Sequence, residues 1–254
     1  MQLYYFTSLK HGLAAIRDKR LKISKFSELN DPADHIGIFV SGVDNRKALR
    51  RQRQRFDAGG GILCMSFDWR EPLLWGHYAD NYKGMCLIFE VDEQWWFDVE
   101  YITERPSLKK FGKERFEDLS RFELFHLGLM KFTNWKYERE FRRFCPFEID
   151  EYDFVENMHF KKFDDAMKLK GALFGFRSNI TKAQIDGIYK SNPDIRLSYT
   201  RFSEKYYRVI VDMTRNFVDL KGKHRVKLNS LEVPSYEDLI DEIGFRKNNK
   251  KIIG

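Results

Sequence analysis

Apolar and polar residues alternate along this chain in a way that predicts short strands interleaved with helices. Apolar runs of strand length, bounded by turn residues, lie at residues 3–6, 21–24, 62–67, 85–91, 171–176, 195–200 and 206–211. Apolar residues at helical spacing lie at residues 9–17, 45–56, 109–131, 160–167 and 182–190. Thr7 or Ser8 is a suitable N-cap for the first of these helices, and we expect Gly59, Gly60 and Gly61 to form a flexible joint. This order of elements favours an α+β fold with a mixed or antiparallel central sheet and flanking helices.

The chain is long and apolar enough to bury a sizeable core, because it has 254 residues of which 43% are hydrophobic. We expect residues 1–213 to form one α+β domain. The sequence turns polar from about Thr214 onward. Residues 214–254 are therefore expected to be a polar C-terminal extension that packs on this domain or trails from it.

Strict alternation at residues 136–144 predicts a strand with two distinct faces. The side chains of Glu138, Glu140 and Arg142 share one of these faces. Two carboxylates beside a cation can raise the pKa of one carboxylate while the arginine holds the other ionised. The same pattern also fits a solvated charge ladder across neighbouring strands, so Glu138 and Glu140 remain candidates for catalysis and no more.

A second group of polar and aromatic residues lies between the strands predicted at 62–67 and 85–91. Trp75, His77 and Tyr78 fall within seven residues of this connection, together with Asp80 and Asn81. Functional residues often gather in loops on a rigid scaffold. Trp75 could stack on a planar ring, and His77 with Tyr78 could form a pair for proton transfer or hydrogen bonding. A structural His–Tyr pair is the competing interpretation.

A third polar segment, Asn30-Asp31-Pro32, carries the signal of a sharp turn. A turn alone accounts for the asparagine and the proline, and a ligand contact accounts for them equally well.

The chain is basic, with a formal charge of +7, which favours anionic partners such as nucleic acids, nucleotides or phosphorylated cofactors. Residues 46–55 concentrate arginine and lysine on one predicted helix, which could follow phosphates while exposed aromatic residues stack on bases. A solvated helix face is the alternative for the same residues.

Several classes of protein are disfavoured by what the sequence lacks. Cys64, Cys86 and Cys145 lie far apart, which argues against a disulfide framework and a structural zinc site, so we predict no metal. Phosphate-loop, dinucleotide-fold, serine-hydrolase and zinc-protease motifs do not occur. Because no signal peptide or apolar run of membrane-spanning length is visible, we expect a cytoplasmic protein without a membrane partner.

Several of these motifs together resemble the bacterial and phage proteins of the domain of unknown function 2971 family. The matching segments are Tyr4-x-x-Thr-Ser, Phe26-Ser-x-x-Asn-Asp-Pro, Cys64-Met-Ser-Phe, Leu74-Trp-Gly-His-Tyr-Ala-Asp-Asn-Tyr-Lys-Gly, Trp135-Lys-Tyr-Glu-Arg-Glu-Phe-Arg and, more weakly, Leu173-Phe-Gly-Phe-Arg-Ser. Members of that family often lie near phage-defence genes, so the resemblance implies a role in phage–host conflict, but it implies no particular activity.

The chain also has a more distant likeness to ADP-ribosyltransferases, which implies a fold of that type and an effector or toxin that uses a nicotinamide dinucleotide. In that superfamily the first strand and helix hold the dinucleotide, an aromatic residue stacks on nicotinamide, and a glutamate on a later strand completes the site. The corresponding residues here would be Tyr5, Thr7, Asn30, Asp31, Trp75, His77, Tyr78 and either Glu138 or Glu140, with Arg142 or the basic helix on the pyrophosphate. Tyr5 stands where many of those enzymes carry His or Arg.

Three hypotheses follow. The first is an ADP-ribosyltransferase-like enzyme that uses NAD. The second is a nucleic-acid-directed protein, either a binder or a nuclease whose metal would be held by carboxylates among Asp31, Asp34, Asp80, Glu138 and Glu140. The third is a non-catalytic sensor that binds a nucleotide in the same pocket.

Overall fold

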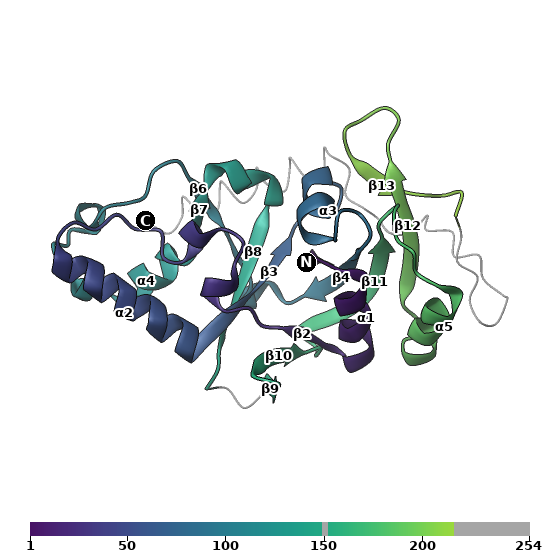
Figure 1. The fold of residues 1–254 in the computed structure, drawn as a ribbon, viewed down its shortest axis with the longest axis horizontal. Coiled ribbons are helices and arrows are strands. Elements are labelled where there is room, and N and C mark those ends of the chain that lie inside the picture. The colour runs from purple at the N-terminus through teal and green to yellow at the C-terminus, as the bar shows by residue number, and fades with distance from the viewer. Residues whose placement is uncertain (149–151, 216–254) are drawn as a thin grey trace.

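A mixed eight-stranded sheet forms the centre of the molecule in the computed structural model, which describes residues 1–148 and 152–215 (Figure 1). The strand order is β13-β12-β11-β4-β1-β3-β8-β5. The strands are β1 (Gln2–Thr7), β3 (Gly60–Ser66), β4 (Met85–Val91), β5 (Phe97–Asp98), β8 (Glu140–Pro146), β11 (Met167–Phe174), β12 (Arg196–Phe202) and β13 (Val209–Val211). Among the described strands of this sheet, β11 and β12 pair in parallel and the other neighbours pair antiparallel. The prediction of an α+β fold with a mixed sheet is confirmed.

Strand β4 lies in the middle of the sheet and is buried along almost its whole length. It is apolar at nearly every position because both of its faces are covered, as is typical of interior strands. Leu87 and Phe89 belong to the core cluster that includes Ile16 of helix α1 (Leu9–Asp18) and Ile185 of helix α5 (Lys182–Ser191). The opposite face of β4 packs in a cluster with helix α3 (Pro72–Tyr78). Figure 1 shows α3 on one side of these strands and α1 and α5 on the other.

The helix starts follow from local capping. The Ser8 hydroxyl accepts a hydrogen bond from the His11 backbone N–H and begins α1, so Ser8 rather than Thr7 is the N-cap. Thr181 begins α5 through a reciprocal capping box with Gln184.

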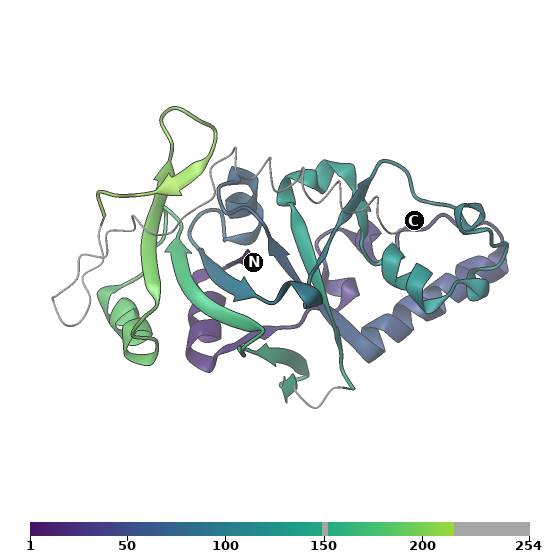
Figure 2. The ribbon, with the colours of Figure 1, turned by 180° about the vertical axis from the view of Figure 1, so that it is seen from behind.

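A smaller apolar cluster lies beside the sheet and forms what we call the α2 lobe. It contains helix α2 (Val43–Gly59), helix α4 (Arg121–Leu127) and the paired strands β6 (Glu100–Ile102) and β7 (Met130–Phe132). Its buried residues are Ile36, Ile38, Ala48, Leu49, Leu108, Phe116, Leu119, Leu127 and Met130. This lobe lies at the end of the molecule opposite α5, as Figure 1 and the reverse view in Figure 2 both show.

The remaining elements are short. A second small sheet has the order β2 (Arg20–Lys22), β10 (Met158–Lys162), β9 (Tyr152–Val155). Short 3-10 helices lie at η1 (Phe26–Glu28), η2 (Pro32–Asp34), η3 (Glu93–Trp95), η4 (Leu108–Phe111), η5 (Phe116–Asp118) and η6 (Thr133–Glu138).

Two of the predicted helices are wrong. The apolar pattern at 109–131 does not continue as one helix, because Gly112 adopts a left-handed backbone with φ of 66° and Ser120 caps a new helix, α4. The pattern at 160–167 forms part of β10 and the start of β11, since residues 160–162 pair with β2. In the first place a local turn and a helix cap interrupt the helical spacing, and in the second place strand pairing overrides it.

Three other predictions are corrected. Gly59 ends α2, and Gly60 and Gly61 open β3 in register with β8, so they form no flexible joint. The predicted loop from Trp75 to Asn81 is wrong in its first half, because residues 75–78 lie in helix α3, and right in its second half, which forms the turn after that helix. The strand predicted at 136–144 begins only at residue 140, because Arg139 has a left-handed backbone with φ of 46° after η6.

No helix in residues 1–148 or 152–215 is both long enough and apolar enough to cross a membrane. Of the predicted polar extension, only Thr214 and Arg215 fall within the described residues, and the rest lies outside them.

Candidate functional site

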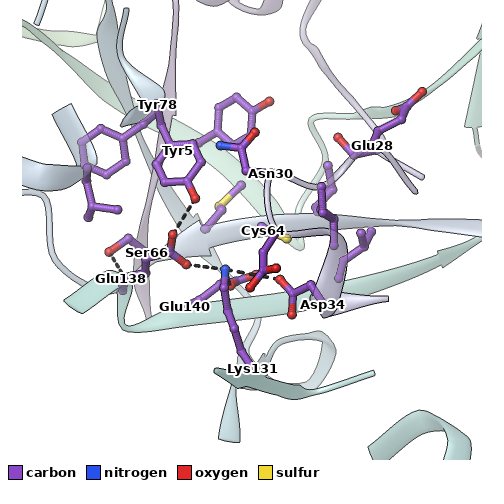
Figure 3. Close-up of a pocket in the computed structure, with 18 of the residues that line it drawn as sticks. Tyr5, Glu28, Asn30, Asp34, Cys64, Ser66, Tyr78, Lys131, Glu138 and Glu140 are labelled. Atoms are coloured by element: carbon purple, nitrogen blue, oxygen red, sulfur yellow. Dashed lines mark hydrogen bonds and ion pairs between the residues drawn. The ribbon is translucent and has the colours of Figure 1, made fainter. Parts of the chain in front are cut away.

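A pocket of about 220 Å³ opens where the edge of the α2 lobe meets the central sheet (Figure 3). Tyr5 of β1 and Tyr78 of α3 line one side, and Asn30, before η2, lines another. Cys64 and Ser66 of β3 also line it, together with a group of buried charged side chains. The pocket therefore collects residues that are far apart in the sequence.

Lys131 of β7 is the centre of that charged group. Its Nζ donates hydrogen bonds to Glu138 Oε2 at 2.5 Å and to Glu140 Oε2 at 2.8 Å, and it lies 3.4 Å from Asp34 Oδ2. Only 7% of Lys131 is exposed. One ammonium group thus holds three carboxylates around a single point, and Figure 3 shows it reaching up from β7 toward them.

Arg142 of β8 binds two of these carboxylates and is completely buried. Its Nε donates to Glu140 Oε1 at 2.7 Å, and its Nη2 donates to Asp34 Oδ2 at 2.7 Å. Its Nη1 donates to the carbonyl oxygen of Gly128 at 2.8 Å. Because every side of this guanidinium is enclosed and it does not line the pocket, the expectation that Arg142 holds a pyrophosphate is wrong.

The two glutamates have different environments. Burial alone would raise the pKa of Glu140, but the charges of Arg142 and Lys131 hold it well below its usual range, so Glu140 is ionised. For Glu138, burial raises the pKa above its usual range despite the neighbouring Lys131. The structure therefore distinguishes a carboxylate at 140 that two cations hold ionised from a carboxylate at 138 whose pKa burial raises.

Tyr78 holds Glu138 from the other side of the carboxylate. Its hydroxyl donates to Glu138 Oε1 at 2.5 Å. Burial and the adjacent Glu138 raise the pKa of Tyr78, which keeps the phenol protonated and able to donate. The two oxygens of Glu138 thus have one donor each, and a carboxylate oxygen can accept more than one hydrogen bond.

The buried group has more negative than positive charge, since three carboxylates face Lys131 and Arg142. Asp34 Oδ1 is buried and has no hydrogen-bond partner among the described residues. Burial raises the pKa of Asp34, although Arg142 and Lys131 oppose this. When all five groups are ionised, one negative charge is left over at the floor of the pocket.

Cys64 of β3 packs against Glu140. Burial raises its pKa well above the usual range, and Glu140 raises it further, so Cys64 is a thiol and not a thiolate nucleophile.

Six of the residues predicted from the sequence line the pocket, and four do not. Those that line it are Tyr5, Asn30, Asp31, Tyr78, Glu138 and Glu140. Those outside it are Thr7, Trp75, His77 and Arg142.

Trp75 cannot stack on a ligand, because it is fully buried. Its indole N–H donates to the carbonyl oxygen of Trp69 at 2.6 Å, and Phe6 packs edge-on against its ring. Trp75 is therefore a core residue.

His77 lies on the exposed side of α3, with its ring 6.2 Å from that of Trp135 and 6.3 Å from that of Tyr137. Tyr78 bonds to Glu138 and not to His77, so the predicted His–Tyr hydrogen-bonded pair is wrong. Thr7 is buried at the end of β1, where its carbonyl oxygen lies against Gly84.

Asp31 has a local structural role even though it lines the pocket. Its Oδ1 accepts from the Ala33 backbone N–H at 2.8 Å, which caps η2, and its Oδ2 accepts from the Trp135 indole at 2.9 Å. The interpretation of the Asn-Asp-Pro segment as a turn accounts for the bond from Ala33, and the bond from Trp135 ties this turn to η6.

Sequence reasoning missed Lys131, Cys64 and Ser66. The available signal for Lys131 was a single charged residue between the apolar residues Met130 and Phe132. The incorrect helix over 109–131 concealed it, since a lysine at a helix end needs no explanation.

The carboxylates proposed for a metal do not gather around a vacant point. Within residues 1–148 and 152–215, no group of three or more His, Cys, Asp or Glu residues is placed to hold a metal ion. Asp34, Glu138 and Glu140 converge on the Lys131 ammonium instead, and Asp80 lies in the exposed turn after α3.

In comparisons with known proteins, no family model matches the chain, and the searches of curated proteins and of solved structures give no significant match. The resemblance to the domain of unknown function 2971 family and the ADP-ribosyltransferase-like fold therefore stay predictions.

Proposed function

We propose that this pocket carries out glycosyl transfer from a nicotinamide dinucleotide, with Glu138 as the carboxylate that faces the reacting ribose. The observation that carries the proposal is that three carboxylates meet two cations at the pocket floor, where Glu138 is held by Tyr78 and Lys131 and has no ion pair with an arginine. Such a floor favours a ligand with a positive charge, and the nicotinamide ring of the oxidised dinucleotide is a pyridinium cation.

The chemistry suits this charge distribution. When the bond between ribose C1′ and the ring nitrogen breaks, its electron pair goes to nitrogen, nicotinamide leaves neutral, and positive charge develops on the ribose. A fixed carboxylate stabilises that charge more in the transition state than in the ground state. Water or a hydroxyl of an acceptor then forms the new bond to C1′, and Glu138 accepts the proton that is lost.

Other residues of the pocket have roles that follow from their positions. Tyr5 lines the pocket on the same side as Tyr78, and its hydroxyl makes no side-chain hydrogen bond within residues 1–148 and 152–215. We assign its ring to packing against nicotinamide. The pyrophosphate must lie away from the carboxylates, because like charges repel. Lys22 at the rim, which forms an exposed ion pair with Glu28 at 3.0 Å, is the cation we assign to it.

The proposal is tested by measuring free nicotinamide chromatographically after incubation of the purified protein with the dinucleotide. We expect release by the parent protein and a loss of about 100-fold or more in Glu138→Gln, which is the usual effect of removing one electrostatic stabiliser. Glu204→Gln, a change to an exposed glutamate in the turn before β13, is the matched control and should release nicotinamide at the parent rate. Urea unfolding of both variants checks that they fold.

A parent protein that releases no nicotinamide would overturn the proposal. Recovery of intact dinucleotide together with a raised melting temperature would instead support the non-catalytic sensor. The role in phage–host conflict depends on the family resemblance alone and stays a prediction.

A further inference from the structure

Helix α2 has an outward half that is mostly basic and carries no acidic residue between residues 46 and 55. Between residues 46 and 55, the exposed positions are Arg46, Lys47, Arg50, Arg51, Gln54 and Arg55. Ala48 and Leu49 point the other way, into the core of the α2 lobe. The outward half therefore presents five cations over nine helical steps, a length of about 14 Å.

Most of these cations have no partner in the described part of the chain. Arg51 pairs with Glu117 at 2.9 Å, and Glu117 also pairs with Arg115 at 2.6 Å. Arg46, Lys47, Arg50 and Arg55 form no ion pair or side-chain hydrogen bond with the described residues. The helix does not neutralise its own outward charge.

This arrangement is unfavourable for an isolated helix. Arg46 and Arg50, Lys47 and Arg51, and Arg51 and Arg55 are like-charged pairs four residues apart, a spacing at which such pairs repel and destabilise a helix. A surface that only needs to be soluble would alternate glutamate with lysine at this spacing. Where a sequence breaks a local rule, the usual reason is a functional requirement.

A groove beside α2 extends the basic surface. It has a volume of about 120 Å³ and is lined by Arg51, Gln52 and Arg55, by apolar residues and by Glu117. Glu117 pairs with Arg51, so Arg55 and the amide of Gln52 are the groups left to donate hydrogen bonds to a phosphate.

We propose that the outward half of α2 and this groove form a docking surface for the phosphate backbone of a nucleic acid. A row of unpaired cations on one helix is complementary to a regular row of phosphates, and binding releases the counterions of the polyanion. The phosphates would also relieve the repulsion within α2. The recognition is independent of base sequence, because the groups involved are charges and not base-reading contacts in a groove. This inference does not depend on the proposed glycosyl transfer.

The test compares two variants that each lose three positive charges. One variant is Arg46→Gln/Arg50→Gln/Arg55→Gln on α2. The control is Lys10→Gln/Lys83→Gln/Lys190→Gln, at exposed lysines without ion pairs on other parts of the described surface. Fluorescence anisotropy measures their binding, and that of the parent, to a labelled single-stranded oligonucleotide and a labelled duplex between about 50 and 200 mM KCl, the range over which phosphate contacts lose affinity.

We expect the parent to bind with a steep salt dependence. The α2 variant should bind at least about tenfold more weakly, with a log–log salt slope smaller by about two to three, which is roughly one per lost phosphate contact. The control should stay within about twofold of the parent. Glu138→Gln should bind like the parent, which separates this result from the outcome for the pocket.

Three results would overturn the inference. The first is no binding by the parent at the lowest salt concentration, and the second is an equal loss in both triple variants, which would indicate a general effect of net charge. The third is binding of vesicles rich in phosphatidylserine that depends on the α2 arginines while neither oligonucleotide binds. Because arginine-to-glutamine changes remove repulsion and keep helix propensity, the α2 variant should unfold at the same or a higher urea concentration.

Discussion

Tyr78 and Glu138 join the two most distinctive segments of the sequence, through a 2.5 Å hydrogen bond between the phenol and Oε1. Tyr78 ends helix α3, and Glu138 ends the 3-10 helix η6, sixty residues later. The bond fixes the direction of the carboxylate into the pocket. Of the aromatic segment at 75–81, Tyr78 therefore contacts the site, whereas Trp75 and His77 do not line the pocket.

Replacing Tyr78 with phenylalanine should reduce nicotinamide release mainly through kcat. The ring still fills its space, but Glu138 loses a hydrogen bond to a charged group, which is worth about 1.5 to 3 kcal/mol. A fall in kcat of about 10- to 100-fold, with KM changed by less than about threefold, is expected from steady-state kinetics. A rise in KM of about 10- to 100-fold with an unchanged kcat would mean that Tyr78 contributes to substrate binding in the ground state. That result would contradict its positioning role.

The pH dependence of kcat/KM should report the pKa of Glu138. Burial raises that pKa above 4.5, the ordinary value, so the acid limb should lie above pH 4.5, with activity lost as pH falls and Glu138 becomes protonated. The Tyr78 hydrogen bond lowers the pKa of Glu138, so Tyr78→Phe should move the limb to higher pH. Tyr5→Phe should leave it in place, because Tyr5 makes no hydrogen bond with Glu138. A limb that shifts equally in both variants would count against the assignment.

Replacing Lys131 with methionine should be strongly destabilising. It leaves Glu138, Glu140 and Asp34 buried without the ammonium they share, and breaking a buried ion pair from one side costs about 3 to 5 kcal/mol. Urea unfolding measures the loss, and Lys136→Met on the exposed side of η6 is the control, with an expected change below about 0.5 kcal/mol. A loss below about 1 kcal/mol for Lys131→Met would mean that the cluster is solvated or protonated.

The sequence predicts the central sheet well because its strands are bounded by clear signals. The run at 85–91 matches β4 at both ends, since Gly84 precedes it and Asp92 follows it. In the α2 lobe the sequence predicts α2 itself but not the shorter elements, which depend on left-handed residues such as Gly112 and on pairing between β6 and β7. Apolar spacing alone carries no information about such long-range contacts.

In the candidate site, too, local patterns are predicted from the sequence and long-range contacts are not. Alternation correctly placed Glu140 and Arg142 together, and their side chains are hydrogen-bonded at 2.7 Å. Glu138 reaches the same cluster by another route, through η6 and the left-handed Arg139, so its predicted neighbours are right although its predicted strand is wrong. Lys131 could not be found from spacing, because its partners come from β8, η6 and η2 and only the folded chain brings them together.

Trp75→Phe should affect stability and leave ligand binding unchanged. The smaller ring leaves a cavity and removes the 2.6 Å hydrogen bond to Trp69, which together should lower the free energy of unfolding by about 2 kcal/mol. The KM for the dinucleotide should stay within about twofold of the parent value, because Trp75 does not line the pocket. A large rise in KM without loss of stability would restore the predicted stacking role.

Gly84→Ala should be among the most damaging small substitutions in the chain. A Cβ at this position would collide with the carbonyl oxygen of Thr7 and lie 2.8 Å from that of Ala79, and backbone oxygens cannot move aside cheaply. The Gly84 N–H also donates to Ala79 at 2.8 Å, which closes the turn that follows α3 and so helps to place Tyr78.

A loss of about 3 kcal/mol is expected for this variant from urea unfolding, at the upper end of the range for overpacking because the new methyl group meets backbone atoms. Gly187→Ala is the matched control, because Gly187 lies on the exposed side of α5 with nothing within 4 Å of the new methyl group. That control should stabilise the protein by about 0.5 to 1 kcal/mol through helix propensity. If the two variants were equally stable, the close approach of Gly84 to β1 would be wrong, and with it the path by which the turn after α3 positions Tyr78.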